Sequence, residues 1–287
     1  MIAAACLAFG GCRGERSLVV VGCKGSTEQL VLGHIVAQLL ESRPRLRVVR
    51  KLNLGDTGTC FSALERGEID VYPEYTGTML TVILKQRASR RTQYTRTRAR
   101  NLLADRYHVR CLSPLGFSHT YVLMMRPSDA ATLGVKTISD LRRHAKTVKA
   151  AFTPEFLTRP DGYRGFVEWY GFELATRPLQ MASGELSRAL LDARVSVVSG
   201  YSTDGCLNSR AVTILKDNRG FFTPYQACLL VRQDALDRVP ELSVLLDQLS
   251  DSINDATVRW MNAEVDIRHR SPSAVAADFL HLHGLVP

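Results

Sequence analysis

The sequence predicts an α/β protein with two lobes, and three observations support this fold class. A β-branched run at residues 17–21 leads into an apolar-periodic stretch that ends at Leu40, and a buried strand that feeds a helix is the repeating unit of α/β folds. The same order of elements returns after residue 137. The chain has 287 residues, of which 45% are hydrophobic, and this is enough apolar material for two cores.

The first lobe is expected to begin with alternating strands and helices. Ser26 precedes the first helix and Gln29 follows three residues later, which is the pattern of a capping box. Gly67 ends the second helix. The expected elements are a strand at 17–21, a helix at 26–40, a strand at 46–54, a helix at 59–66 and a strand at 68–72.

The second lobe repeats this order, and the C-terminal part of the chain is expected to be helical. The expected elements are a helix at 137–144, a strand at 147–152, helices at 166–170 and 185–192, and a strand at 195–199. Apolar periodicity then predicts amphipathic helices at 239–253, 256–264 and 272–283.

Composition narrows the class of protein. Charged residues make up 23% of the chain, an ordinary value that excludes an intrinsically disordered protein. The formal net charge is +9, and much of the excess lies in residues 85–100. No zinc-finger spacing or RNA-binding aromatic signature accompanies this stretch. We therefore interpret it as a solvated helix or loop face, and we expect no nucleic-acid partner.

The first residues resemble the end of a bacterial lipoprotein signal. Residues 1–12 form a short apolar run that ends in Gly10, Gly11 and Cys12, although no Lys or Arg precedes it. We expect residues 1–16 to be a leader and linker, with Cys12 as the candidate for lipidation. The protein would then lie in the periplasm or on the extracytoplasmic face of the membrane. No other stretch approaches the roughly 18–20 apolar residues of a membrane span.

Motifs for catalysis or metal binding are weak. The seven cysteines contain no CxxC pair, and the one HxH pair, His281 and His283, lies at the C-terminal helix end. The sequence has no GxSxG, HExxH or Walker motif. We expect no enzyme activity, metal or cofactor, and we expect buried free thiols.

One internal similarity points to a binding cleft. A helix, a strand and a terminal tyrosine occur twice, with Tyr75 placed 12 residues after Ala63 and Tyr201 placed 12 residues after Ala189. Ligands of open α/β sheets bind at the carboxyl ends of the strands. Tyr75 and Tyr201 are therefore expected to face each other across a cleft between the lobes.

The residues around these strand ends suit a zwitterion with a quaternary ammonium group. A tyrosine ring face attracts a cation that has no N–H donor of its own, and the tyrosines beyond strand ends are Tyr75, Tyr121, Tyr201 and Tyr225. Lys24 follows the first strand beside a helix N-terminus, where anions are favoured. Arg159 lies in a turn-rich loop. Either cation is a candidate partner for a carboxylate.

These residues also carry a resemblance to a known family. From about residue 17 to its end, the chain resembles the glycine betaine/choline/carnitine-binding proteins of ABC importers, of the ProX and OsmF type. The matching stretches are VVGCKGSTEQ at 20–29, DVYPEYTGT at 70–78, LGFSHTY at 115–121, TPEFL at 153–157 with Arg159, YSTDG at 201–205, GFFTPY at 220–225 and NAEVD at 262–266.

The resemblance implies a type II periplasmic-binding-protein fold, with two α/β lobes joined by two crossover strands. It implies lobe 1 at 17–121 plus 226–287 and lobe 2 at 122–225, with hinges near 121–124 and 225–231. The cation cage would be Tyr75, Tyr121, Tyr201 and Tyr225. The carboxylate clamp would be Lys24, Thr78 and Arg159, where the hydroxyl of Thr78 can donate to a carboxylate.

Some positions depart from the family pattern. His119 stands where the family tends to have Asn or Asp, and it is a candidate to line the pocket because it precedes Tyr121 by two residues. The implied function is that of the extracytoplasmic substrate-binding component of an ABC transporter for quaternary-ammonium compounds. Its partners would be an ABC permease and ATPase, with the membrane reached by a lipid anchor or through the permease.

Glycine betaine, choline, carnitine and ergothioneine all remain open as ligands. A ligand-sensing module and an enzyme on the same fold are the alternatives from other functional classes.

Overall fold

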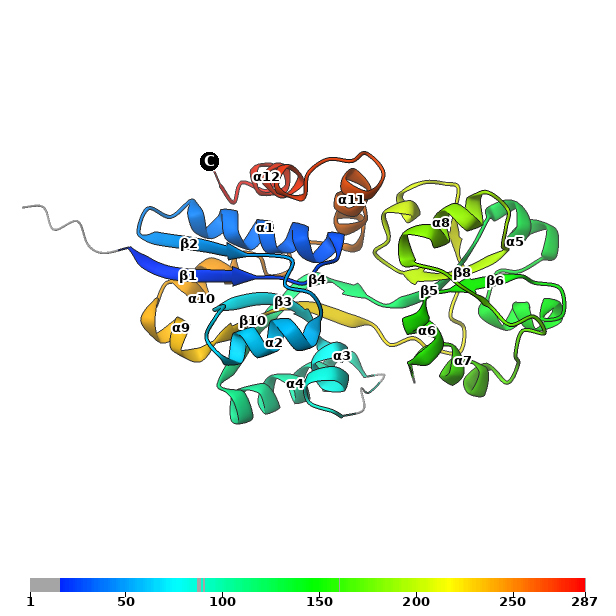
Figure 1. Ribbon diagram of the computed structural model, residues 1–287, viewed down its shortest axis with the longest axis horizontal. Coiled ribbons are helices and arrows are strands. Elements are labelled where there is room, and N and C mark those ends of the chain that lie inside the picture. Colours follow the sequence, from blue (N-terminus) through cyan, green and yellow to red (C-terminus); the bar gives the residue numbers. More distant parts are fainter. Residues whose placement is uncertain (1–15, 87–88, 90, 160, 287) are drawn as a thin grey trace, which may run out of the picture.

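Two five-stranded sheets form two lobes that lie side by side (Figure 1). This computed structural model describes residues 16–86, 89, 91–159 and 161–286, so the expected leader and Cys12 lie outside the described residues. The strand order is β2-β1-β3-β10-β4 in the first sheet and β7-β6-β8-β5-β9 in the second. The prediction of two α/β lobes is therefore confirmed.

The first lobe contains the N-terminal strands and the C-terminal helices. Its N-terminal elements are β1 (Ser17–Gly22), α1 (Thr27–Glu41), β2 (Leu46–Lys51), α2 (Thr57–Glu65), β3 (Val71–Tyr75), α3 (Thr76–Thr78), a π-helical turn (Met79–Ile83), α4 (Thr92–Tyr107) and β4 (Val109–His119). Its C-terminal elements are β10 (Tyr225–Arg232), α9 (Gln233–Arg238), α10 (Leu242–Asp247), α11 (Asp255–Asp266) and α12 (Pro272–Leu282).

The second lobe is built from the middle of the chain and has shorter elements. They are β5 (Tyr121–Met125), α5 (Pro127–Leu133), a 3-10 helix (Ile138–His144), β6 (Ala150–Phe152), α6 (Pro154–Thr158), α7 (Tyr163–Tyr170), β7 (Leu179–Gln180), α8 (Ser183–Leu191), β8 (Val197–Tyr201), a 3-10 helix (Gly205–Asn208) and β9 (Thr213–Ile214).

Each sheet carries an apolar layer on both faces. In the first lobe, α1, α11 and α12 cover one face and α2 and α4 cover the other (Figure 1). The second lobe has an aromatic core that includes Phe152, Phe156 and Phe166. Four of the five described cysteines are buried and all five are free, as expected from the sequence. The packing of these two cores fixes the positions of the strand ends that meet between the lobes.

The chain crosses between the lobes twice, at neighbouring points. Only Thr120 separates β4 of the first sheet from β5 of the second. The return crossing begins at β10, where Tyr225 pairs with His119 in an antiparallel register. In the second sheet, Tyr121 of β5 pairs with Tyr201 of β8, also in an antiparallel register. Strand pairing therefore brings four aromatic residues to the junction of the two lobes.

Several expected boundaries are wrong for identifiable reasons. The strand expected at 68–72 begins at Val71, because the Asp70 carboxylate accepts the N–H of Val20 (2.8 Å) in place of a backbone partner. The helix expected at 239–253 is reduced to α10. Residues beyond it turn toward β4, where the N–H of Asp251 donates to Pro114 and that of Ile253 donates to Leu115.

The expected capping box at the start of α1 is also wrong. Ser26 is the residue before the helix, but its side chain makes no capping hydrogen bond. Ser26 instead lines the cavity between the lobes. The first turn of α1 thus keeps N–H groups without a side-chain cap at the cavity wall.

Candidate ligand-binding site

A cavity of about 930 Å³ lies between the lobes, where the strands of both sheets end. Its wall includes the start of α1, the end of β3, the end of β4, the loop after α6 and the end of β8. Every ligand-site residue that the sequence suggested lines this one cavity: Lys24, Tyr75, Thr78, His119, Tyr121, Arg159, Tyr201 and Tyr225.

Four aromatic rings form a continuous stack in the cavity. The centroid of His119 lies 4.5 Å from that of Tyr75 and 4.0 Å from that of Tyr201, and Tyr201 lies 4.9 Å from Tyr121. The interplanar angles are 20°, 26° and 24°, so the rings are close to parallel. Tyr75 and Tyr201 therefore do approach each other from the two sheets, but the His119 imidazole lies between them.

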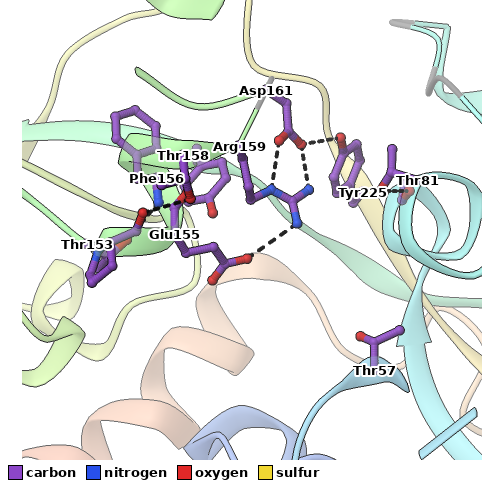
Figure 2. A network of polar contacts seen from close by, with 12 residues as sticks. Thr57, Thr81, Thr153, Glu155, Phe156, Thr158, Arg159, Asp161 and Tyr225 are labelled. Atoms are coloured by element: carbon purple, nitrogen blue, oxygen red, sulfur yellow. Dashed lines mark hydrogen bonds and ion pairs between the residues drawn. The ribbon is translucent and has the colours of Figure 1, made fainter. Parts of the chain in front are cut away.

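Tyr225 lies apart from this stack and belongs to a polar network (Figure 2). Its hydroxyl donates to Asp161 Oδ2 (2.9 Å) across the junction of the lobes. Asp161 also accepts two hydrogen bonds from Arg159, at 2.7 Å from Nε and 2.8 Å from Nη2. A third contact joins Arg159 Nη1 to Glu155 at 3.3 Å. Two carboxylates thus surround the guanidinium group that the sequence suggested as a ligand partner.

Asp161 remains ionised in this network. Burial raises the pKa of the Asp161 carboxyl, but the hydrogen bonds and the charge of Arg159, with the hydroxyl of Tyr225, lower it below its usual value overall. The short loop after α6 explains the geometry, since Arg159 and Asp161 are two residues apart and their side chains meet in a bidentate pair.

Lys24 is paired in a similar way. Its Nζ donates to Glu74 Oε1 (2.6 Å) and lies 4.7 Å from the ring centroid of Tyr75. Glu74 is fully buried, and its other oxygen accepts from the hydroxyl of Thr57 at 3.0 Å. Sequence reasoning missed Glu74. The sequence does contain a signal for Glu74, which is an acidic residue inside an apolar strand. That strand lies beside the strand that precedes Lys24. A buried carboxylate requires a cation as its partner, so Lys24 is the expected one.

Glu28 is the second functional side chain that sequence reasoning missed. It is 5% exposed and accepts hydrogen bonds from the hydroxyl of Tyr75 and from Asn262 Nδ2 (3.1 Å). His119 Nδ1 lies 3.4 Å from the same carboxylate and 3.0 Å from the hydroxyl of Thr203. Burial alone would raise the pKa of Glu28, but His119 and the hydrogen bonds lower it to about 2. The carboxylate of Glu28 thus holds the rings of Tyr75 and His119 in place.

Glu28→Gln is expected to lower the free energy of unfolding at neutral pH by about 1.5–3 kcal/mol, the contribution of a hydrogen bond to a charged group. The carboxylate has a pKa of about 2 in the folded protein and an ordinary value of 4.5. Its stabilisation is therefore fully present above about pH 4.5 and is lost as the pH falls toward 2. Urea unfolding at neutral pH and near pH 3 measures the difference from wild type, which should shrink in acid.

The exposed Glu65 provides the control, since Glu65→Gln removes the same charge from a solvated position. That variant should unfold like wild type at both pH values. A difference between Glu28→Gln and wild type that stays constant with pH would show that the carboxylate does not stabilise the folded state.

The cavity carries an excess of negative charge, although the whole chain has a net charge of +9. Its lining includes two Lys or Arg residues, Lys24 and Arg159, and six carboxylates: Glu28, Asp56, Glu155, Asp161, Asp204 and Asp266. A cleft lined by one sign of charge concentrates ligands of the other sign. Among the described residues, no group of three His, Cys, Asp or Glu side chains is arranged to hold a metal ion.

Two α/β lobes joined by two strands, with an aromatic cavity at the junction, define a solute-binding protein. The chain belongs to the family of substrate binding domains of ABC-type glycine betaine transport systems, whose model matches residues 17–281. Its role is therefore that of the substrate-binding protein of such a transport system. Within the described residues, every helix is too short or too polar to cross a membrane.

Known relatives agree with this assignment. The glycine-betaine-binding protein of Pseudomonas aeruginosa is 34% identical over 278 residues, which cover 93% of this chain and 88% of that protein. The ergothioneine transport permease/ergothioneine binding protein EgtU of Helicobacter pylori is 30% identical over 272 residues, or 94% of this chain. The match spans 48% of the length of EgtU, so this chain corresponds to about half of that relative.

A solved structure shows the same fold. The structure described as a glycine betaine/carnitine/choline ABC transporter superposes with a TM-score of 0.85 and 27% sequence identity, covering 93% of this chain and 99% of that one. The expected type II periplasmic-binding-protein fold is thereby confirmed.

Proposed function

We propose that the protein binds a small quaternary-ammonium compound, such as glycine betaine, choline or carnitine, in the cavity between its lobes. The observation that carries this proposal is the stack of Tyr75, Tyr121 and Tyr201 with His119 inside a cavity rich in carboxylates. A trimethylammonium group is a weakly hydrated cation without N–H donors, and aromatic ring faces are its physical complement.

In this proposal Tyr75, Tyr121, Tyr201 and Tyr225 surround the cation, and His119 is a further wall of the site. The imidazole lies between Tyr75 and Tyr201, at 4.5 and 4.0 Å from their centroids, so a cation that enters there must displace it or stack against it. The excess of carboxylates in the cavity supports entry of a positively charged group.

Lys24, Thr78 and Arg159 are the proposed partners of the ligand carboxylate. All three line the cavity. The uncapped first turn of α1, next to Lys24, adds N–H groups and the positive end of the helix dipole. Lys24 and Arg159 are both ion-paired within the protein, with Glu74 and Asp161. A ligand carboxylate therefore competes with these two internal acids, whereas choline, which has no carboxylate, does not.

Closure of the lobes is the proposed mechanism of capture. Lobe 1 comprises residues 17–121 and 226–287, lobe 2 comprises residues 122–225, and the hinges lie near 121–124 and 225–231. A ligand that contacts residues of both lobes favours the closed form by its difference in affinity for the two forms. The closed protein then delivers its ligand to an ABC permease driven by an ATPase, on the extracytoplasmic face of the membrane, where Cys12 is the proposed lipid anchor.

A thermal-shift and calorimetric screen tests this function. Glycine betaine, choline and carnitine are expected to raise the melting temperature by about 5–10 °C at a hundred times their dissociation constant, because a ligand that binds only the folded state stabilises it by about 2.7 kcal/mol there. Glycine, which has the carboxylate but no methyl groups on nitrogen, is the control and should leave the melting temperature unchanged. Turnover of a bound compound into a product would contradict a pure binding role.

A further inference from the structure

The positive charge of this protein is concentrated in one segment. Residues 85–110 contain nine Lys and Arg residues and one Asp, a net charge of +8 from nine minus one, and the whole chain has +9. In the rest of the sequence, the positive and negative charges are therefore nearly equal in number. Such an asymmetry of charge along a chain often marks a contact with nucleic acid or with a membrane.

The described part of this segment, centred on α4, forms one exposed face of the first lobe. The helix α4 packs on the first lobe (Figure 1). Thr95, Ala99 and Leu103 are its buried residues, whereas its arginines are exposed or half-buried. We define the α4 face as the exposed Arg91, Tyr94, Arg98, Arg100, Arg106 and the adjoining Arg110 at the start of β4. None of these residues lines the cavity.

The arginines of the α4 face have no acidic partners among the described residues. Arg98 donates to the neutral side chain of Gln86 (2.6 Å). Several arginines elsewhere in the protein do pair with carboxylates, for example Arg50 with Glu41 and Arg270 with Asp278. Arg96 and Arg100 are four residues apart on α4, a spacing at which like charges destabilise a helix. The unpaired charges thus oppose folding slightly and are available to an external anion.

Tyr94 adds an aromatic ring to this face. It is 52% exposed, one of the few large apolar side chains on the surface of the described chain. Arg91, Tyr94 and Arg98 are three and four residues apart, so they lie on one side of the helix. Tyrosine is enriched at the headgroup level of membranes, because its ring is apolar and its hydroxyl remains hydrated.

We propose that the α4 face binds the anionic phospholipid headgroups of the membrane that holds the transporter. Clusters of four to eight basic residues on a helix are attracted to anionic lipid surfaces, with about a fivefold gain in partitioning per residue. The location at a membrane rests on the proposed function, whereas the lipid contact rests on the α4 face. This contact would hold the protein against the bilayer by its first lobe, which leaves the second lobe free to move during closure.

Binding of the full chain to vesicles tests the proposal. We expect it to bind vesicles of two parts phosphatidylcholine to one part phosphatidylglycerol, and not vesicles of phosphatidylcholine alone. Binding should disappear near 1 M salt, where the screening length is about 3 Å instead of about 10 Å at 0.1 M. The triple variant Arg91→Gln, Arg98→Gln, Arg100→Gln should lower the partition coefficient by roughly a hundredfold. Tyr94→Ala should lower it further by a smaller factor.

A matched triple variant on the second lobe separates the α4 face from overall charge. Arg142→Gln, Lys146→Gln and Lys149→Gln remove the same charge from exposed positions outside the α4 face, and vesicle binding should stay near wild type. Equal losses in the two triple variants, or binding only to neutral vesicles that contain the permease, would overturn the lipid contact. Both triples should keep the wild-type affinity for glycine betaine, so a failure of ligand binding in all forms would count against the proposed function alone.

Discussion

Tyr201→Ala is expected to weaken the binding of glycine betaine and choline by about 5- to 30-fold, which corresponds to about 1–2 kcal/mol for a lost cation–ring contact. Tyr201 is the ring that joins the two halves of the stack, because it contacts His119 at 4.0 Å and Tyr121 at 4.9 Å. Removal of this ring therefore disturbs the faces on both of its sides. Isothermal titration calorimetry of the purified protein measures the change.

Tyr201→Phe is the matched control for this prediction. It keeps the ring and removes only the hydroxyl, which donates to Tyr121 at 3.3 Å. Its affinity should stay within a few fold of wild type, since the cation is attracted to the ring face. Wild-type affinity in Tyr201→Ala would exclude this ring from the cation site.

Arg159→Ala is expected to weaken the binding of ligands that carry a carboxylate more than the binding of choline. A charge-assisted hydrogen bond contributes about 1.5–3 kcal/mol, so glycine betaine and carnitine should lose roughly tenfold to hundredfold in affinity. Choline has no carboxylate and should lose much less. Competition binding with the three ligands, on the same protein preparation, gives the ratio directly.

Asp161→Asn tests the same assignment from the opposite direction. In the structure Asp161 accepts two hydrogen bonds from Arg159, at 2.7 and 2.8 Å, and therefore competes with a ligand carboxylate. The amide keeps the shape and removes the charge, so glycine betaine should bind more tightly relative to choline. Equal effects of Arg159→Ala on all three ligands would contradict the carboxylate clamp.

The sequence predicted which residues meet at the junction of the lobes, and strand ends explain why. Tyr75 and Tyr201 are the last residues of β3 and β8, as the repeated helix–strand–tyrosine pattern indicated. A strand end is a local property, set by the length of an apolar run and by the turn that follows it. Such properties are readable from one sequence.

The contacts among those residues could not be predicted, because they depend on strand register. Tyr225 pairs with His119 at one end of the β10–β4 ladder, and the register of that ladder shifts between Gln226 and Cys228. A shift of one residue moves every side chain to the other face of a sheet. Hydrophobic periodicity does not reveal such irregularities, so the position of His119 between two tyrosines was not foreseen.

The internal acids were missed for a related reason. Glu28 and Glu74 lie in stretches that match the family pattern, but that pattern alone does not indicate their roles. Their partners are distant in the chain, 50 residues from Glu74 to Lys24 and 234 from Glu28 to Asn262. Only the folded arrangement shows that Lys24 and Arg159, which a single sequence presents as free cations, are already neutralised by the protein.

The single residue between β4 and β5 has a consequence for how affinity can change. The carbonyl of Thr120 accepts the N–H of Ser202 (2.9 Å), and its hydroxyl donates to the carbonyl of Thr223 (3.1 Å). Thr120 therefore joins both crossings, and it lines the cavity without being one of the stacked rings. If the lobes close about this point, a substitution there changes the fraction of molecules that are ready to bind. The measured dissociation constant scales inversely with that fraction. Under that closure, a change at Thr120 alters the affinity for different solutes by a common factor and leaves the aromatic rings in place.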